Sequence, residues 1–185
     1  QLSSPIEVSI VVNSPPTAND DSFVINEDEV YATTVANGVL ANDVDAEDDN
    51  LVVSLVESTQ HGTLELNPDG SFSYQSQANY FGSDSFTYQL SDGEDSSAIA
   101  TVSLEVRAVN DAPSAEDDVY FALANETLEV SVLAGVLAND SDIEGGELSA
   151  VLATPPAQGT LTLQTDGSFT YQPVADTTGV VEFTY

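Results

Sequence analysis

Acidic residues recur at a fixed spacing in a motif that the chain contains twice. The first copy, Gly38–Asp45, reads GVLANDVD, and the second, Gly135–Asp142, reads GVLANDSD. A hard cation such as Ca²⁺ takes about 6–8 oxygen ligands, and alternating acidic residues with backbone carbonyls between them can supply them. We therefore predict that the two aspartates of each motif bind a divalent cation. These aspartates are Asp43, Asp45, Asp140 and Asp142.

The same motif also has a purely structural interpretation. Asparagine and aspartate stabilise turns through their side chains, and Asn42 and Asn139 could cap such a turn. An EF-hand is excluded, although the second copy begins like one. Its twelfth position, which needs a glutamate, holds Val151.

The charge balance limits the partners of the chain. Its 185 residues include 32 acidic side chains against a single arginine and no lysine, which gives a formal net charge of −31. Nucleic acid and anionic membranes are excluded, because both need basic residues at the contact. The absence of cysteine excludes disulfides and cysteine-ligated metals. Two carboxylates about 4 Å apart repel by roughly 1 kcal/mol in water and roughly 4 kcal/mol at an effective dielectric near 20, so salt or divalent cations must supply the counter-charge.

An internal repeat sets the domain organisation. Residues 16–88 align without a gap with residues 113–185, 97 positions later, with about two positions in five identical. We predict that residues 1–14 are the last strand of a preceding repeat, that 15–111 form a complete repeat, and that 112–185 form a repeat lacking its last strand. We hypothesise that the strand in 1–14 completes the second repeat of a neighbouring molecule. The alternative is that the natural chain continues and supplies that strand itself.

Alternating apolar residues predict an all-β, antiparallel sandwich, and no stretch has a helical period. The clearest hairpin is 63–74, with Asp69-Gly70 at its turn. The Val-Leu of each acidic motif is expected to end a strand. In the strand 98–106 the inward residues are expected to be Ala98, Ala100, Val102, Leu104 and Val106. Further strands are expected at 23–25, 30–35, 50–56 and 84–90.

Five motifs together resemble cadherin repeats, and more closely the bacterial cadherin-like, VCBS-type tandem repeats of large surface adhesins. They are VNDAP at 109–113, the AxDD that opens each repeat, GVLANDxD, GTLxLxxDGSFxYQ and DSFTYQLSDG. The resemblance covers nearly the whole chain. It implies cadherin-like, Ig-like β-sandwich modules arranged in arrays, with Ca²⁺ ions near the module junctions.

The resemblance also implies a set of cation ligands. Besides the motif aspartates it points to Glu27, Asp92, Asn110 and Asp111. Two departures from the family pattern, Ala108 in the linker and Ala124 in place of Glu27, imply fewer ions than in animal cadherins. Acidic pairs also follow the prolines of both repeats, where they are either ligands or residues that favour the start of a strand. These pairs are Asp20, Asp21, Asp117 and Asp118.

We expect no enzyme, because cysteine is absent and His61 is replaced by Gln158 in the other repeat. The sequence leaves open an acid pair for glycoside hydrolysis. The leading hypothesis is a Ca²⁺-binding extender module of a secreted bacterial cell-surface adhesin that acts in cell adhesion, aggregation or biofilm. Its partners would be calcium ions and neighbouring repeats. The alternative is a Ca²⁺-dependent module that binds polysaccharide or another cadherin-like chain.

Overall fold

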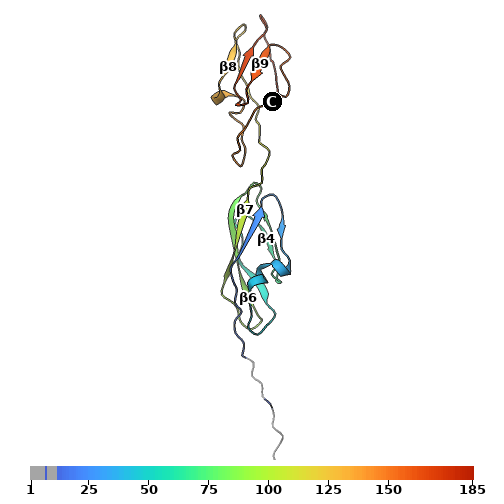
Figure 1. Ribbon diagram of the computed structural model, residues 1–185, viewed down its shortest axis with the longest axis vertical. Helices are drawn as coiled ribbons and strands as arrows, with labels where there is room; N and C mark the ends of the chain where they lie inside the picture. Colours follow the sequence, from blue (N-terminus) through green and yellow to red (C-terminus); the bar gives the residue numbers. More distant parts are fainter. Residues whose placement is uncertain (1–6, 8–11) are drawn as a thin grey trace, which may run out of the picture. The chain divides into compact units, whose positions relative to one another are not determined.

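The computed structural model describes Glu7 and residues 12–185 (Figure 1). The chain divides into two units, with the boundary between Val109 and Asn110. Strands and short 3-10 turns make up the regular structure, and the described residues contain no α-helix. The strand expected within 1–14 falls largely outside the described residues, so it and its exchange between molecules stay predictions.

The first unit consists of two sheets. The larger sheet has the strand order β1-β7-β6-β3, in which β1 runs parallel to β7 and the other pairs are antiparallel. Its strands are β1 (Asp21–Asn26), β3 (Val52–Glu57), β6 (Gly82–Ser91) and β7 (Ala100–Arg107). The smaller sheet has the order β2-β5-β4. Its strands are β2 (Tyr31–Ala32), β4 (Gly62–Leu66) and β5 (Phe72–Ser76). The predicted all-β sandwich class is confirmed.

Alternating residues of both sheets form the core of the first unit. Phe72 on β5 and Phe86 on β6 expose 2% and 1% of their surfaces, and their rings meet edge to face at 5.4 Å. The prediction for the last strand is wrong at one end, because Ala98 is exposed and the strand begins at Ala100. Ser97 turns inward instead, where its hydroxyl accepts the amide of Leu90 at 2.9 Å. This local hydrogen bond overrides the apolar alternation.

The expected strand at 30–35 is shortened to β2, because the chain turns soon after Ala32. Two 3-10 turns follow, Val35–Asn37 and Val39–Asn42. The amide and the hydroxyl of Thr34 both donate to Oδ1 of Asn37 at 2.7 Å. A side chain that captures backbone donors in this way stops the extended conformation from continuing.

The second unit repeats the hairpin of the first. Its sheet has the order β8-β10-β9 and is antiparallel throughout. Its strands are β8 (Leu128–Val130), β9 (Thr160–Leu163) and β10 (Phe169–Gln172), and a 3-10 turn lies at Val132–Ala134. Gly70 and Gly167 occupy the same turn position with φ of 81° and 82°, where only glycine is free of strain. The repeat in the sequence is therefore a repeat in the structure.

Candidate cation-binding site

Each acidic motif is anchored in the core by its valine. Val39 and Val136 expose 0% of their surfaces. Their amides donate at 2.9 Å to the carbonyls of Gly70 and Gly167, which lie at the hairpin turns. The Val-Leu of the first motif does not end a strand as expected, because the segment Val39–Asn42 is a 3-10 turn. The anchoring is thus retained while the backbone conformation differs.

The first aspartate of each motif is held by donors from its own unit. Oδ1 of Asp43 accepts the amide of Asn19 at 2.7 Å, and Oδ2 accepts the hydroxyl of Tyr88 at 2.9 Å. Asp140 has the corresponding contacts, with the amide of Glu116 at 2.9 Å and the hydroxyl of Tyr185 at 3.2 Å. In both units this carboxylate ties the first extended segment and a tyrosine to the motif, which is a structural role.

The tyrosine hydroxyl of the first unit is surrounded by acceptors. Tyr88 has one hydroxyl proton, and four oxygens lie within 3.2 Å of it, from the backbones of Asn19 and Val39 and the carboxylates of Asp21 and Asp43. Burial raises the pKa of Asp21 to about 6. The hydrogen bond from Tyr88 opposes this rise, and the charge of Asp43 adds to it. Burial also raises the pKa of Tyr88, and the two carboxylates raise it further.

The second aspartate of the first motif organises the acidic loop itself. Oδ1 of Asp45 accepts the amides of Glu47 and Asp49, both at 3.0 Å. Its other oxygen, Oδ2, is buried, and no donor of the described residues reaches it. Oδ1 of Asp45 thus holds the acidic loop together, and Oδ2 has no hydrogen-bond donor among the described residues.

Two acidic loops of the first unit meet the segment that leads into it. Ser14 donates its hydroxyl to Oε2 of Glu47 at 2.8 Å. Asn13 donates its amide to Asp92 at 2.9 Å and to Asp95 at 3.3 Å. Hydrogen bonds from Asn13 and from backbone amides hold the pKa of Asp92 below its usual value.

The second unit has the same arrangement at its beginning. The amide of Asp111, the counterpart of Ser14, donates to Oε2 of Glu144 at 3.0 Å. Oε1 of Glu144 is buried, and no donor of the described residues reaches it. Asp142 closes the loop by accepting the amide of Gly146 at 2.7 Å. Asn110 donates its side-chain amide to the carbonyl of Asp111 at 2.8 Å.

Glu27 carries a further buried carboxylate. It exposes 0% of its surface, and Oε1 accepts the amide of Val109 at 2.9 Å. Oε2 is buried without a donor from the described residues. A buried polar oxygen without a hydrogen-bond donor costs roughly 1–3 kcal/mol. Ala124 takes this position in the second unit, which therefore lacks the corresponding carboxylate.

The acidic pairs after the prolines have different partners. Asp20 accepts the amide of Thr101 at 2.8 Å. Asp118 accepts the hydroxyls of Tyr120 at 3.3 Å and Tyr185 at 3.2 Å. The backbone carbonyl of Asp117 accepts the side-chain amide of Asn139 at 3.4 Å. These contacts place Asp20 and Asp118 within hydrogen-bond networks of their own units, and their ligation of a cation stays a prediction.

The acidic side chains of the described residues differ in how well they could hold a cation. Among the described residues, no group of three or more histidine or acidic side chains converges into a ready-made metal centre. The chemistry of the donors still fits a hard cation, because Asp45, Glu144 and Glu27 each offer a buried carboxylate oxygen that lacks a donor. Glu47, Glu144 and Asp95 were not among the expected ligands. The signal for the two glutamates was present, since both stand four residues after the first aspartate of their motif.

Comparison with known proteins decides the family. The profile of the bacterial cadherin-like domain matches residues 13–108 and again 110–185. The chain belongs to the bacterial cadherin-like domain family. No curated protein sequence matches it significantly. The parallel pairing of β1 with β7 and the repeated acidic loops are thus features of a cadherin-like module in this chain.

A solved cadherin structure shares the fold. The extracellular cadherin domains 1–5 of protocadherin gamma B2 match with a TM-score of 0.53 and 14% identity, over 86% of this chain and 32% of that one. Cadherin domains 3–6 of protocadherin gamma B7 match with a TM-score of 0.48 and 10% identity, over 86% and 39%. An endo-fucoidan hydrolase of glycoside hydrolase family 107 matches with a TM-score of 0.43 and 16% identity, over 98% and 30%. The chain therefore spans less than half the length of these proteins.

Family membership points to an adhesion-type module. Bacterial cadherin-like domains are typically extracellular and non-enzymatic. No helix among the described residues is long and apolar enough to cross a membrane.

Proposed function

We propose that each unit binds Ca²⁺ where its leading segment meets its acidic loop, and that the chain is an extender of a secreted bacterial cell-surface adhesin. One observation carries the proposal, which is that the contact of Ser14 with Glu47 recurs as the contact of Asp111 with Glu144. Both units thus place a loop carboxylate against the segment that leads into them.

The first unit supplies ligands from three segments. Asp45 and Glu47 come from the motif loop, Asp92 from the loop after β6, and Asn13 from the leading segment. A cation among them would have carboxylate, amide and backbone oxygens within reach, which is the donor set that Ca²⁺ prefers. In the second unit Asp142, Glu144 and the pair Asn110-Asp111 take these places.

The benefit of the cation is electrostatic. Buried carboxylate oxygens such as Oδ2 of Asp45 and Oε1 of Glu144 have no donor from the described residues to offset their desolvation. A bound divalent ion supplies that positive charge and removes the repulsion between the loop acids. It also ties the leading segment to the unit, which restricts the motion of that segment.

The repeat supports a mechanical role rather than catalysis. Units that recur in tandem with the same anchors and the same acidic loop are suited to build length. Glu27 holds the last segment of the first unit in place, because its carboxylate accepts the amide of Val109. Such modules would separate the binding tip of an adhesin from the cell surface, in adhesion, aggregation or biofilm.

Small-angle scattering with and without calcium tests the proposal. We expect that EDTA increases the flexibility of the wild type, and that in calcium the double variant Asp142→Asn/Glu144→Gln is more flexible than the wild type. The control is Asp166→Asn, which removes one charge from the hairpin turn of the same unit, where Asp166 accepts the hydroxyl of Ser168. The control is expected to respond to calcium like the wild type. Scattering that chelation leaves unchanged would show that the ions do not stiffen the chain.

A further inference from the structure

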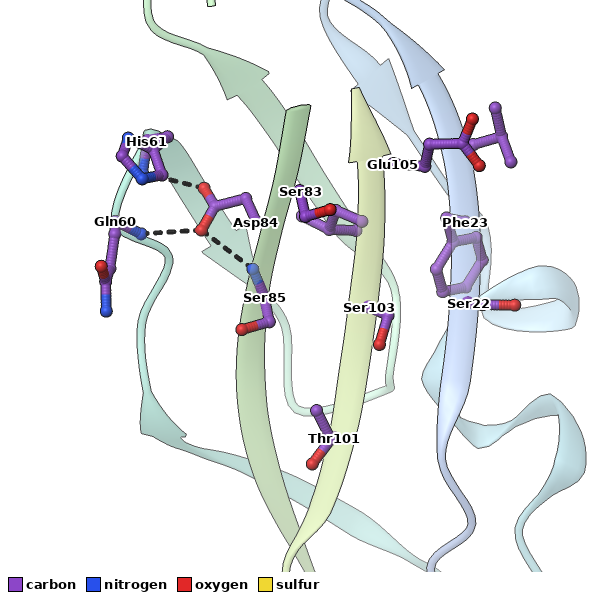
Figure 2. A pocket seen from close by; sticks show the side chains of 12 residues that line it. Ser22, Phe23, Gln60, His61, Ser83, Asp84, Ser85, Thr101, Ser103 and Glu105 are labelled. Carbon is purple, nitrogen blue, oxygen red and sulfur yellow. Dashed lines mark hydrogen bonds between the residues drawn. The ribbon is translucent and has the colours of Figure 1, made fainter. Parts of the chain in front are cut away.

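A groove on the first unit lies on the solvent face of the larger sheet, apart from the acidic loops. It has a volume of about 720 Å³ and is lined by residues of β1, β6 and β7 and by the loop that carries Gln60 and His61 (Figure 2). Hydroxyl groups dominate the strand side of the groove. These groups determine which class of ligand the groove can bind.

Three serines form a straight row across the floor of the groove. Ser22 on β1 is paired in register with Ser103 on β7, and Ser103 is paired with Ser85 on β6. Neighbouring strands lie about 4.8 Å apart, so the row places one serine on each strand at about that interval. All three residues are exposed, and among the described residues none of the three hydroxyls has a hydrogen-bond partner. Each can therefore both donate and accept a hydrogen bond to a ligand.

The rim of the groove is held in place by a buried carboxylate. Asp84 exposes 7% of its surface and accepts the amides of Gln60 and His61, both at 2.9 Å (Figure 2). It also accepts the hydroxyl of Tyr74 at 2.9 Å. Burial alone would raise the pKa of Asp84, and these hydrogen bonds together hold it below its usual value. The loop is thus fixed before any ligand arrives, which lowers the entropic cost of binding.

The fixed loop presents the polar side chains of Gln60 and His61. The ring of His61 stacks on Tyr80, with centroids 4.2 Å apart and planes 6° from parallel. Within the described part of the chain, neither this imidazole nor the side-chain amide of Gln60 is hydrogen-bonded. Together with the serine row they form an array of unpaired donors and acceptors around one hollow.

We propose that this groove binds a neutral polysaccharide. A polyhydroxylated chain matches polar donors and acceptors at short intervals, because each sugar hydroxyl can both donate and accept a hydrogen bond. Anionic glycans are disfavoured, because Glu105 lines the groove and the chain has a net charge of −31. The single arginine, Arg107, is paired with Glu105 at 3.4 Å.

The second unit has lost this chemistry at the corresponding positions. Val119, Ala157 and Val180 replace Ser22, Gln60 and Ser83, and the counterpart of Asp84 is Val181. A hollow of about 490 Å³ lies at these positions of the second unit, and Ala157, Val180 and Val181 are among the residues that line it. The polar lining is therefore a property of the first unit, and it does not depend on the cation sites proposed for both units. Glycan binding and cation-dependent stiffening can consequently fail independently.

Affinity electrophoresis of the whole chain in gels containing soluble polysaccharides tests the proposal. The neutral probes are dextran, galactomannan, xyloglucan and mixed-linkage β-glucan, and alginate is the anionic probe. We expect at least one neutral probe to retard the wild type, equally in calcium and in EDTA, and alginate to have no effect. The double variant Gln60→Ala/Ser103→Val should lose at least tenfold in affinity, with thermal unfolding unchanged because valine suits an exposed strand position.

The matched control is Thr63→Val, which removes an exposed hydroxyl from β4 of the other sheet. It should keep the affinity of the wild type. The proposal is overturned if no neutral probe retards the chain, if the double variant binds like the wild type, or if EDTA abolishes retardation. The last result would assign the glycan to the cation sites.

Discussion

The substitution Asp21→Asn is predicted to stabilise the first unit at neutral pH and to have no effect at pH 4. Asp21 lies beside the Tyr88 hydroxyl, where four acceptor oxygens compete for one proton. Burial raises its pKa from 3.8 to about 6 in the folded protein. The folded chain therefore binds more protons than the unfolded chain between these values, and the free energy of unfolding falls as the pH rises through that window.

The size of the effect follows from the shift. One pKa unit corresponds to about 1.36 kcal/mol, so the full shift would correspond to about 3 kcal/mol. Asp21 is partly exposed to solvent, which screens its charge and reduces this figure to about 1–2 kcal/mol. An asparagine keeps an oxygen for the Tyr88 hydroxyl and removes the buried charge. For a unit of this size, a gain of 1 kcal/mol raises the Tm by about 4–8 °C.

The assay is thermal unfolding of wild type and variant from pH 4 to pH 8 in EDTA. We expect the difference in Tm to be near zero at pH 4 and to grow through pH 6. The control Asp69→Asn should behave in the opposite way. Hydrogen bonds from the hydroxyl and the amide of Ser71 lower the pKa of Asp69, so its carboxylate contributes stability that is lost as the pH falls. A variant at Asp21 that is less stable at pH 7, or a difference independent of pH, would refute the reasoning.

Three further substitutions test the structural roles. Asp84→Val, the residue of the second unit, should cost at least about 3 kcal/mol in the free energy of unfolding, because three backbone amides and a tyrosine hydroxyl lose their acceptor. Asp48→Gly should stabilise the first unit by about 0.5–1 kcal/mol, because Asp48 has a φ of 61° and its counterpart is Gly145 with a φ of 75°. Gly38→Ala should cost several °C in Tm, because its methyl group would lie 2.1 Å from the carbonyl oxygen of Gly70. Chemical denaturation measures the first two variants against the wild type, and thermal unfolding measures the third. An unchanged midpoint for any variant would contradict its prediction.

Much of the fold could be predicted because the alternation of apolar residues is strong. Phe72 and Tyr74 on β5 and Phe86 and Tyr88 on β6 are buried as their spacing predicts. The errors arose where a polar side chain bonds locally to the backbone. Ser97 displaced Ala98 from the core in this way, and Asn37 ended the expected strand. Such contacts depend on geometry that spacing does not reveal.

The division of roles between the two aspartates of the first motif could not be predicted from their spacing. The spacing of Asp43 and Asp45 suggested two equivalent ligands, yet the first bonds to Tyr88 and the second closes the acidic loop. Tyr88 lies 45 residues from Asp43, so no residue near the motif indicates that the two side chains are in contact. The serine row could not be predicted from the sequence for the same reason. Ser22 and Ser103 lie far apart in the chain and become neighbours only through the pairing of β1 with β7.

Calcium titration by isothermal calorimetry tests the central claim most directly. The account predicts saturable binding in each unit, with the unit-two site lost in Asp142→Asn/Glu144→Gln and retained in Asp166→Asn. Calcium at a hundred times its Kd should stabilise a unit by about 2.7 kcal/mol. A titration with no saturable heat, together with the same Tm in calcium and in EDTA, would contradict it.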